Sequence, residues 1–504
     1  MGKLRLGCAL SLALIGCGDD GGSKTPDAPT VADAPADVAI DGPVETLGAH
    51  PALAMACNDA LADVYTLPSG LPAMDDTRRG DVFRCAKAES LSKYKVNRQI
   101  DDYAMGYQNT VAGNATSGFW GYRIAYRSTR NTVAAARAEG AMGAILLVPE
   151  TPLAGAPLLV FGHGSVGFAP QCAPSRVDLS GPKRDDDYPP VLLRLAGAGY
   201  TVIAPDYAGY SFNQPHGYFN AEDEAHAILD ATRAAAKILT NPPAKVAFVG
   251  HSQGGHAAVA AQSYAESYGM TGQLVGVATL APFWVSLTLF AAATTDAAGP
   301  LSTANAGDIN SILYAMVYAW SATELREGAG SGTTVFQAAK RTAARDAMFG
   351  GACYDQAKMM ALGTNPVDWF DATYVTQVAN QCALGGNCTD ATAAKWRARW
   401  PEDRPAIDAT GAPILAMWGG ADTFIGPARA ACGRNKWAAD TSGGGSTTMI
   451  TNCYSATTAH RDFPRTSEVD YLMSWIANKA GIGPAPAACT APPTTACAMF
   501  PNDF

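Results

Sequence analysis

The chain has 504 residues, of which 48% are hydrophobic and 16% are charged, and its formal net charge is −9. This length allows one large α/β domain with insertions or two to three smaller domains, and the apolar content suffices for an extensive core. No basic run suggests a nucleic-acid interface. Residues 17–50 carry six Asp, one Glu and one Lys, so the remainder of the chain is only mildly acidic.

Residues 1–16 have the pattern of an export signal. Lys3 and Arg5 precede an apolar stretch over residues 6–15 that is too short to span a bilayer. The stretch leads into a Leu-Ile-Gly-Cys sequence ending at Cys17, which resembles a bacterial lipobox, where the cysteine is lipidated and becomes the mature N-terminus. We therefore expect a signal peptide over 1–16 and a lipid on Cys17. An ordinary signal peptide with a coincidental cysteine is the alternative.

The segment after Cys17 is rich in Gly, Asp, Ala and Pro over residues 18–50. With few large apolar side chains, it cannot bury enough surface to offset the entropy of ordering it. We expect residues 17–50 to be a disordered, extended tether that holds the rest of the chain away from a membrane. Gly18 stands where Asp would favour retention in the inner membrane, so the outer membrane or cell surface is the expected location.

Residues 51–118 mix helical stretches, turns and charges, and we interpret them as an N-terminal extension. From residue 119 onward, apolar runs alternate with helical segments, which predicts a mostly parallel sheet with helices on both faces. Asn220 caps the clearest helix, residues 220–239, and another helix is expected over 466–479. The strands are expected at residues 122–127, 144–148, 157–161, 200–204, 246–249, 274–280, 413–418 and 446–451.

The most informative motif is Gly250-His251-Ser252-Gln253-Gly254-Gly255. It follows the apolar run 246–249 and opens a stretch of small, helix-compatible residues, so a Gly-x-Ser-x-Gly sequence stands between strand and helix. In such a nucleophile elbow the serine lies on a sharp turn, and glycines flank it because larger side chains would clash. The serine also lies at a helix N-terminus, where N–H groups favour negative charge. Ser252 is the expected nucleophile, and a glycine-rich turn without catalytic role is the alternative.

Residues 283–405 interrupt the alternation of strands and helices. They are Ala-rich and helical in parts, with aromatic clusters, and they stand between two core strands. We expect them to form a helical cap inserted into the core, and an independent helical domain is the alternative. The core then comprises residues 119–282 and 406–480, and residues 481–504 form a C-terminal tail.

A serine nucleophile needs a base, and the base needs a carboxylate that fixes its tautomer. The chain order expected with this elbow is serine, acid, histidine. Of seven histidines only His460 follows the elbow and its helix, so it is the expected base, with a surface-loop histidine as the alternative. Asp422 follows the strand 413–418, which places it at the same sheet edge as Ser252. Three other carboxylates are disfavoured because they precede that strand, lie in a later linker or adjoin the histidine: Asp408, Asp440 and Asp462.

Twelve cysteines are present, and an exported chain with an even number of them is expected to form disulfides. Cys8 is removed with the signal and Cys17 carries the lipid, which leaves ten. Their spacing does not form a zinc pattern. The pairings we expect from spacing are Cys382 with Cys388, Cys489 with Cys497 in the tail, and Cys432 with Cys453, although sequence does not fix connectivity.

These motifs resemble the α/β-hydrolase superfamily, and within it the secretory lipases of the kind typified by Candida antarctica lipase A. The resemblance covers residues 119–480 and is carried by the Phe-Gly-His-Gly loop at 161–164, Ala-Pro-Asp-Tyr-Ala-Gly at 204–209, the elbow, and the Asp422/His460 pair. It implies hydrolysis of acylglycerols or other carboxylic esters, with a cap over the acyl site.

The tetrahedral intermediate of such a reaction needs N–H donors. One is the backbone N–H of Gln253, directly after the nucleophile. In many α/β-hydrolases with a His-Gly dipeptide after the early strand, the next residue supplies the second donor, which is Ser165 here. His163 is expected to pack in this loop without a catalytic role, and Asp206 to fix a loop near the oxyanion hole.

The sequence thus predicts acyl transfer through Ser252, with a lipid or ester substrate, a membrane contact through the N-terminal lipid, and no nucleic acid. No metal or organic cofactor is required for this chemistry. A peptidase or a polysaccharide acyl esterase on the same fold is the first alternative, because the same triad cleaves amides and esters. A non-catalytic binding protein is the second.

Overall fold

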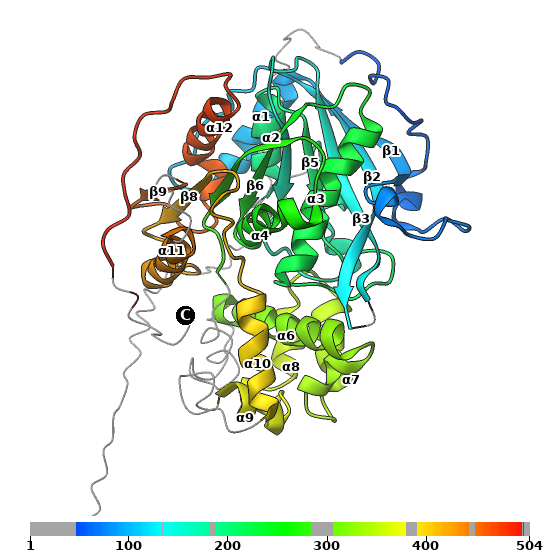
Figure 1. Cartoon of the computed structure of the whole chain (residues 1–504), viewed down its shortest axis with the longest axis vertical. Coiled ribbons are helices and arrows are strands. Elements are labelled where there is room, and N and C mark those ends of the chain that lie inside the picture. The colour runs from blue at the N-terminus through cyan, green and yellow to red at the C-terminus, as the bar shows by residue number, and fades with distance from the viewer. Residues whose placement is uncertain are drawn as a thin grey trace, which may run out of the picture. The chain divides into compact units, whose positions relative to one another are not determined.

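A nine-stranded, mostly parallel sheet forms the centre of the described part of the chain (Figure 1). The computed structural model describes residues 47–133, 135–181, 188–284, 306–379, 391–442, 449–495 and 497. They belong to one compact unit, residues 45–504. Among them, no helix is both long enough and apolar enough to cross a membrane. The predicted fold class is confirmed, whereas the signal peptide, Cys17 and almost all of the tether lie outside the described residues.

The strand order in the sheet is β1-β2-β3-β5-β4-β6-β7-β8-β9. The first three strands pair antiparallel and β3 also pairs antiparallel with β5, while all later pairs are parallel. The strands are β1 (Val82–Leu91), β2 (Phe119–Thr132), β3 (Ala135–Pro149), β4 (Leu158–Gly162), β5 (Val202–Pro205), β6 (Lys245–His251), β7 (Gln273–Leu280), β8 (Ile414–Gly419) and β9 (Ile450–Ser455).

Helices cover both faces of the sheet, as the continuous apolar strands predict. Along β4, Leu158 and Val160 pack into one core cluster, while Leu159 and Phe161 pack into the other. One face is covered by α3 (Ala221–Ile238), α4 (Gln253–Tyr268) and α11 (Pro427–Ser442). The opposite face is covered by α1 (Lys93–Ala104), α2 (Tyr188–Gly197) and α12 (Glu468–Lys479).

The best-predicted helix, α3, begins as its sequence indicates. Asn220 accepts a hydrogen bond of 2.9 Å from the N–H of Asp223 through its side chain. The last strand was predicted less well, because β9 begins at Ile450 rather than at residue 446. The N-terminal extension also contributes β1 to the sheet, and the sequence analysis did not anticipate this strand.

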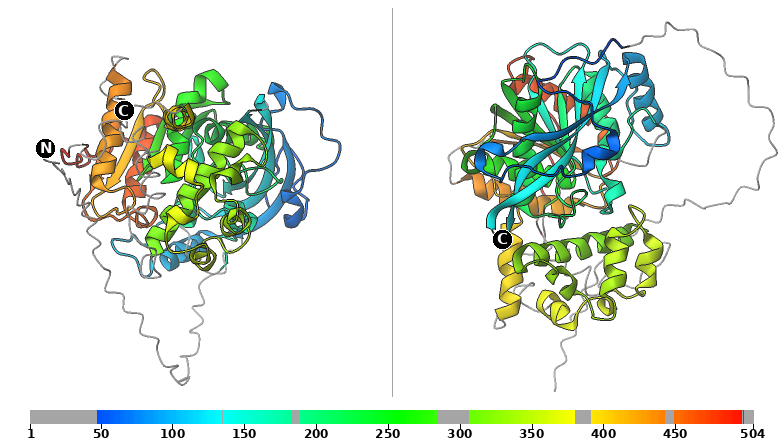
Figure 2. Two further views of the ribbon diagram at one scale, coloured as in Figure 1. Left: turned by 90° about the horizontal axis from the view of Figure 1, so that it is seen from below. Right: turned by 90° about the vertical axis from the view of Figure 1, so that its right-hand side faces the viewer.

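Among the described residues, five helices lie between β7 and β8 in the sequence and form a separate group beyond one end of the sheet (Figures 1 and 2). They are α6 (Ala306–Glu327), α7 (Arg341–Phe349), α8 (Gln356–Ala361), α9 (Ala372–Ala379) and α10 (Ala391–Glu402). This group, called the cap helices below, occupies the predicted cap segment. The expected pair Cys382 and Cys388 falls within this segment but outside the described residues.

Short 3-10 turns connect several of these elements. They span Leu61–Tyr65, Asp76–Arg78, Pro170–Cys172, Pro174–Arg176, Ser331–Val335, Pro366–Asp368 and Phe463–Arg465.

Disulfides attach coil segments to both edge strands of the sheet. Cys57 bonds to Cys85 of β1, and Cys489 bonds to Cys453 of β9. Beside the second bond, the carbonyl of Thr490 accepts a 2.8 Å hydrogen bond from the backbone N–H of the residue after Cys453. Edge strands with free backbone groups are sites of unwanted pairing, so both attached segments shield the sheet.

Two of the expected disulfide pairings are wrong. The bonds join Cys432 to Cys497 and Cys453 to Cys489, instead of Cys432 to Cys453 and Cys489 to Cys497. The physical reason is the path of the C-terminal tail, which leaves α12 and runs past β9 toward α11 (Figure 1). Its two cysteines therefore reach two different core elements and cannot close a small local loop.

We expect the double substitution Cys453→Ser/Cys489→Ser to lower the free energy of unfolding. The bond closes a loop with a sequence separation of 36 residues, and restricting an unfolded loop of that length is worth about 4 kcal/mol. Guanidinium denaturation under non-reducing conditions measures the change. A denaturation midpoint equal to that of the wild type would show that the Cys453–Cys489 bond does not stabilise the fold.

Candidate active site

The turn between β6 and α4 holds Ser252 in a backbone conformation that few non-glycine residues adopt, with φ 55° and ψ −116°. Two glycines permit this turn. A Cβ on Gly250 would lie 1.9 Å from the carbonyl oxygen of Gly254, and a Cβ on Gly254 would lie 1.8 Å from the carbonyl oxygen of Gly162. The strand, the strained serine and the helix thus have the elbow geometry that the motif predicts.

His460 and Asp422 lie beside this serine in a hydrogen-bonded chain. The Nε2 atom of His460 is 2.9 Å from Oγ of Ser252, and Nδ1 of His460 is 2.7 Å from Oδ2 of Asp422. Asp422 follows β8, and His460 follows β9, so adjacent parallel strands deliver both groups to the same sheet edge. The three residues selected from the sequence are therefore brought together.

The carboxylate of Asp422 is held ionised by its surroundings. Burial opposes its charge, but the attraction and hydrogen bond of His460 hold the pKa of Asp422 below its ordinary value. The backbone N–H groups of Phe424 and Ile425 add hydrogen bonds of 2.8 and 2.7 Å to Oδ1. An ionised Asp422 accepts a hydrogen bond from Nδ1–H of His460, which leaves Nε2 unprotonated and able to accept the proton of Ser252.

The two expected oxyanion residues also lie at the elbow. Gly164, which precedes Ser165, comes so close that a Cβ there would be 3.5 Å from Cβ of Ser252. Gln253 is the first residue of α4, directly after the serine. The side chains of the two residues contact each other, because Oγ of Ser165 donates to Oε1 of Gln253 at 3.2 Å.

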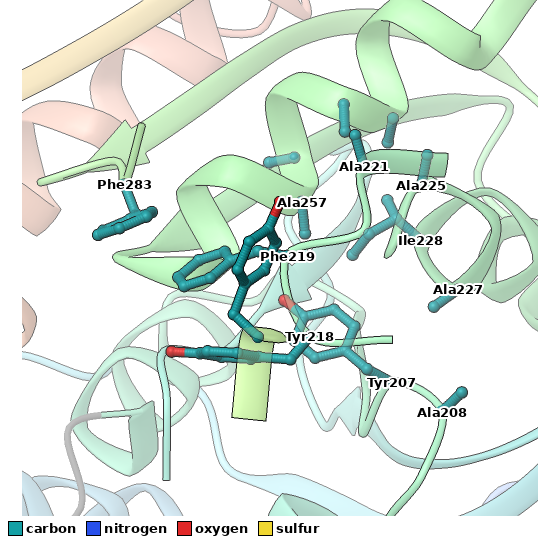
Figure 3. Packing of buried hydrophobic residues seen from close by; sticks show 14 of the residues in the cluster. Tyr207, Ala208, Tyr218, Phe219, Ala221, Ala225, Ala227, Ile228, Ala257 and Phe283 are labelled. Carbon is teal, nitrogen blue, oxygen red and sulfur yellow. The ribbon is translucent and has the colours of Figure 1, made fainter. Parts of the chain in front are cut away.

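Aromatic rings pack around the elbow. Phe219 and Phe283 stack with ring centroids 4.2 Å apart, and Tyr218 lies equally close to Phe219 (Figure 3). The backbone N–H of Phe283 donates to the carbonyl of Ser252 at 3.0 Å, which ties this ring to the turn. Buried aromatic side chains therefore pack beside the turn that carries the serine.

Two contacts of the site were not anticipated. Nε2 of His251 lies 2.9 Å from the carbonyl oxygen of His460, so the elbow holds the loop that carries the expected base. The side chain of Glu224, in the first turn of α3, is buried and accepts a hydrogen bond from Nε2 of Gln253. No sequence pattern indicates the His251 contact, because it joins residues 209 positions apart.

Asp206 is not part of the hydrogen-bonded chain, in agreement with the expectation that it fixes a loop. Its carboxylate accepts from the backbone N–H and the hydroxyl of Ser175, at 2.7 and 2.5 Å. Its backbone oxygen lies 3.2 Å from Nε2 of His163, in the loop that leads to Ser165. Across the described residues, no group of three or more His, Cys, Asp or Glu is arranged to hold a metal ion.

Asp206 is expected to make stability depend on pH. Burial raises the pKa of Asp206 from 3.8 to about 6, against the opposing hydrogen bonds of Ser175. Between these two pKa values the folded chain keeps a proton on Asp206 that the unfolded chain has released. Protonated Asp206 therefore adds to the free energy of unfolding in full below pH 3.8, and this addition is lost as pH rises through about 6. The difference corresponds to about 3 kcal/mol.

The isosteric substitution Asp206→Asn removes this titration. In urea denaturation between pH 4 and 7, we expect the stability of the wild type relative to the variant to fall as pH rises. A constant difference across this range would show that Asp206 titrates near its ordinary pKa.

Comparison with known proteins agrees with this geometry. The model of the secretory lipase family matches residues 189–351. Lipase A of Moesziomyces aphidis is 29% identical over 239 residues, which is 46% of this chain and 44% of the relative's length. The chain therefore spans less than half of this relative.

Solved structures share the fold over most of the chain. Candida antarctica lipase A in its closed state has a TM-score of 0.60 and 18% identity, covering 89% of this chain and 92% of that one. The rice cell wall degrading esterase LipA from Xanthomonas oryzae has a TM-score of 0.53 and 18% identity, covering 80% of this chain and 97% of that one. The fold expected from the motifs is confirmed: the chain has the fold of these lipase and esterase structures, and part of it matches the secretory lipase family model.

Proposed function

We propose that this protein is a serine hydrolase that cleaves carboxylic esters, with acylglycerols as the preferred class. The observation that carries the proposal is the continuous hydrogen-bonded chain from Ser252 through His460 to Asp422. The match to the secretory lipase family supports an ester as substrate. The aromatic side chains packed beside the serine turn support an apolar acyl group.

The reaction proceeds by acyl transfer in two steps. Nε2 of His460 removes the proton from Ser252 as Oγ attacks the ester carbonyl carbon, and Asp422 stabilises the imidazolium. The backbone N–H groups of Ser165 and Gln253 bind the oxyanion. His460 then gives its proton to the leaving alcohol. A water molecule, deprotonated by His460, attacks the acyl-enzyme and releases the acid with Ser252 restored.

The cap helices belong to the same proposal. In it, residues 283–405 cover the acyl site, residues 119–282 and 406–480 form the catalytic core, and residues 481–504 are a disulfide-bonded tail. Contacts between the cap and the core support this arrangement, since Cys353 of the cap bonds to Cys172 beside the oxyanion loop.

We also propose how the protein reaches its substrate. The secretory lipase match is consistent with export. In this proposal residues 1–16 are removed as a signal peptide, Cys17 carries a lipid, and residues 17–50 tether the enzyme to the outer membrane or the cell surface. The charge and composition of the N-terminal segment support this arrangement.

Replacing Ser252 by Ala should lower kcat for p-nitrophenyl butyrate by roughly 10⁴- to 10⁶-fold, because the nucleophile is lost. Ser263→Ala, on the same helix, is the matched control and should leave turnover unchanged. A fluorophosphonate probe should label the wild type and the control but not the Ser252 variant. Retained turnover in Ser252→Ala would reject the proposed nucleophile, and an unlabelled wild type would favour a binding protein.

The substrate class is tested with the wild-type enzyme. Acylglycerols and a chain-length series of nitrophenyl esters are compared with an aminoacyl nitroanilide and a feruloyl ester. We expect the acylglycerols to give the highest kcat/KM. A preference for the anilide would indicate a peptidase, and a preference for the feruloyl ester would indicate a polysaccharide acyl esterase.

The lipid anchor is tested by growing cells that express the full chain with radiolabelled palmitate. The wild type should incorporate label and sediment with membranes, while Cys17→Ser should do neither. Cys8→Ser, inside the signal segment, is the control and should behave as the wild type. Absence of label from the wild type would indicate an ordinary signal peptide.

A further inference from the structure

A buried carboxylate lies beneath the elbow and is not used by the proposed reaction. Glu224 of α3 is 1% exposed, and its carboxylate accepts three hydrogen bonds. Oε1 accepts from the backbone N–H of Phe219 at 3.0 Å and from Nε2 of Gln253 at 2.7 Å. Oε2 is 2.7 Å from Nδ1 of His256. All three partner atoms are nitrogen atoms that can donate a hydrogen bond to the carboxylate.

His256 is the ion-pair partner of Glu224. The second ring nitrogen of His256, Nε2, lies 2.7 Å from the carbonyl oxygen of Asp403, which can only accept. Both ring nitrogens therefore face acceptors, as expected for an imidazolium that donates twice. Burial disfavours this charge, but the adjacent Glu224 raises the pKa of His256 above its ordinary value. The two residues form an ion pair in which neither side chain is exposed by more than 1%.

From this pair, a chain of side chains reaches the oxyanion loop. The amide of Gln253 donates to Glu224 through Nε2 and accepts from Ser165 Oγ through Oε1. The hydroxyl of Ser165 in turn lies 2.7 Å from that of Tyr218. Burial keeps the pKa of Tyr218 well above its ordinary value, so its hydroxyl is protonated and donates to Ser165.

This chain joins the two residues whose backbone N–H groups bind the oxyanion in the proposed mechanism. Ser165 lies on the loop after β4, and Gln253 begins α4 after β6. The two strands pair as far as Gly162 and Gly250, and both residues lie beyond that last pair. The amide of Gln253 bridges them, and Glu224 fixes the orientation of that amide. A donor pair that is already in place costs no reorganisation when the oxyanion forms.

We propose that Glu224 is a positioning residue that acts through the Gln253 side chain to hold the N–H groups of Ser165 and Gln253 in register for the oxyanion. The proposal rests on the function given above. It separates two roles of residue 253, because the backbone N–H binds the oxyanion and the side chain sets where Ser165 lies.

The first test replaces Gln253 by Met, which keeps the backbone N–H and the side-chain length but removes the bridge. We expect kcat for p-nitrophenyl butyrate to fall roughly tenfold, less than the 10²- to 10³-fold loss that follows removal of an oxyanion donor. KM should change by less than about twofold, because the bridge acts in the transition state. The Ki of an alkyl trifluoromethyl ketone, whose adduct carries an oxyanion, should rise in parallel with the loss of kcat.

The second test replaces Glu224 by Ala. This variant should show the same pattern of kinetic losses, and the double variant Glu224→Ala/Gln253→Met should lose little more than either single variant, because both break one link. Glu222→Ala is the matched control. Glu222 lies on the first turn of the same helix and also contacts a histidine, but its partners, Asn131 and His226, lie outside the site. Its kinetics should equal those of the wild type.

The outcomes separate this proposal from the proposed function. If the wild type neither turns over esters nor labels with fluorophosphonate, the proposed function fails first. If the wild type is active but Gln253→Met keeps wild-type kcat and ketone Ki, the positioning role alone is rejected. Losses that multiply in the double variant would also reject it. Should Glu224→Ala fail to fold, the Gln253→Met result still decides the question.

Discussion

The close approach of two backbones at the elbow is the constraint on which the rest of the site depends. Gly254 packs so tightly on the end of β4 that a single methyl group there would lie 1.8 Å from the carbonyl oxygen of Gly162. Because α4 can come this close, the loop after β4 lies beside Ser252 and the strained serine is held from both sides. A wider spacing would separate the nucleophile from the N–H groups proposed to stabilise the charge that it creates.

Burial strengthens the interactions between charged groups in this region, but removing those charges from water costs free energy. Asp422 is 3% exposed, and its charge is compensated by an imidazole and two backbone N–H groups. The Glu224 and His256 pair is even less accessible, and well-packed apolar residues are often as stable as such a pair. Retaining an ion pair there is easier to explain by geometry than by stability, since the carboxylate orients the amide that contacts the oxyanion loop.

The features that could be predicted from the sequence are those set by neighbouring residues, such as strands, helix ends and tight turns. The alternation of apolar runs and helices predicts the parallel sheet, Asn220 predicts the start of α3, and the elbow motif predicts the turn at Ser252. Chain order and strand ends then suffice to select Asp422 and His460, because parallel strands deliver their C-terminal ends to one edge. The disulfide pairings of the tail could not be predicted, because they depend on the path of the tail past β9 and α11. The contacts of Glu224 with Gln253 and His256 could not be predicted either, because they depend on how α3 packs against α4.

The segment between α7 and α8 contacts the stretch that follows β4. Cys353 bonds to Cys172, and a Cβ on Gly167 would lie 2.0 Å from the carbonyl oxygen of Cys353. The hydroxyl of Tyr354 donates to the carbonyl of Ser165. This covalent bond spans a sequence separation of 181 residues and fixes the segment around Cys353 to the segment around Cys172. The loop that carries Ser165 is therefore supported both by Gln253 at the elbow and by the segment between α7 and α8.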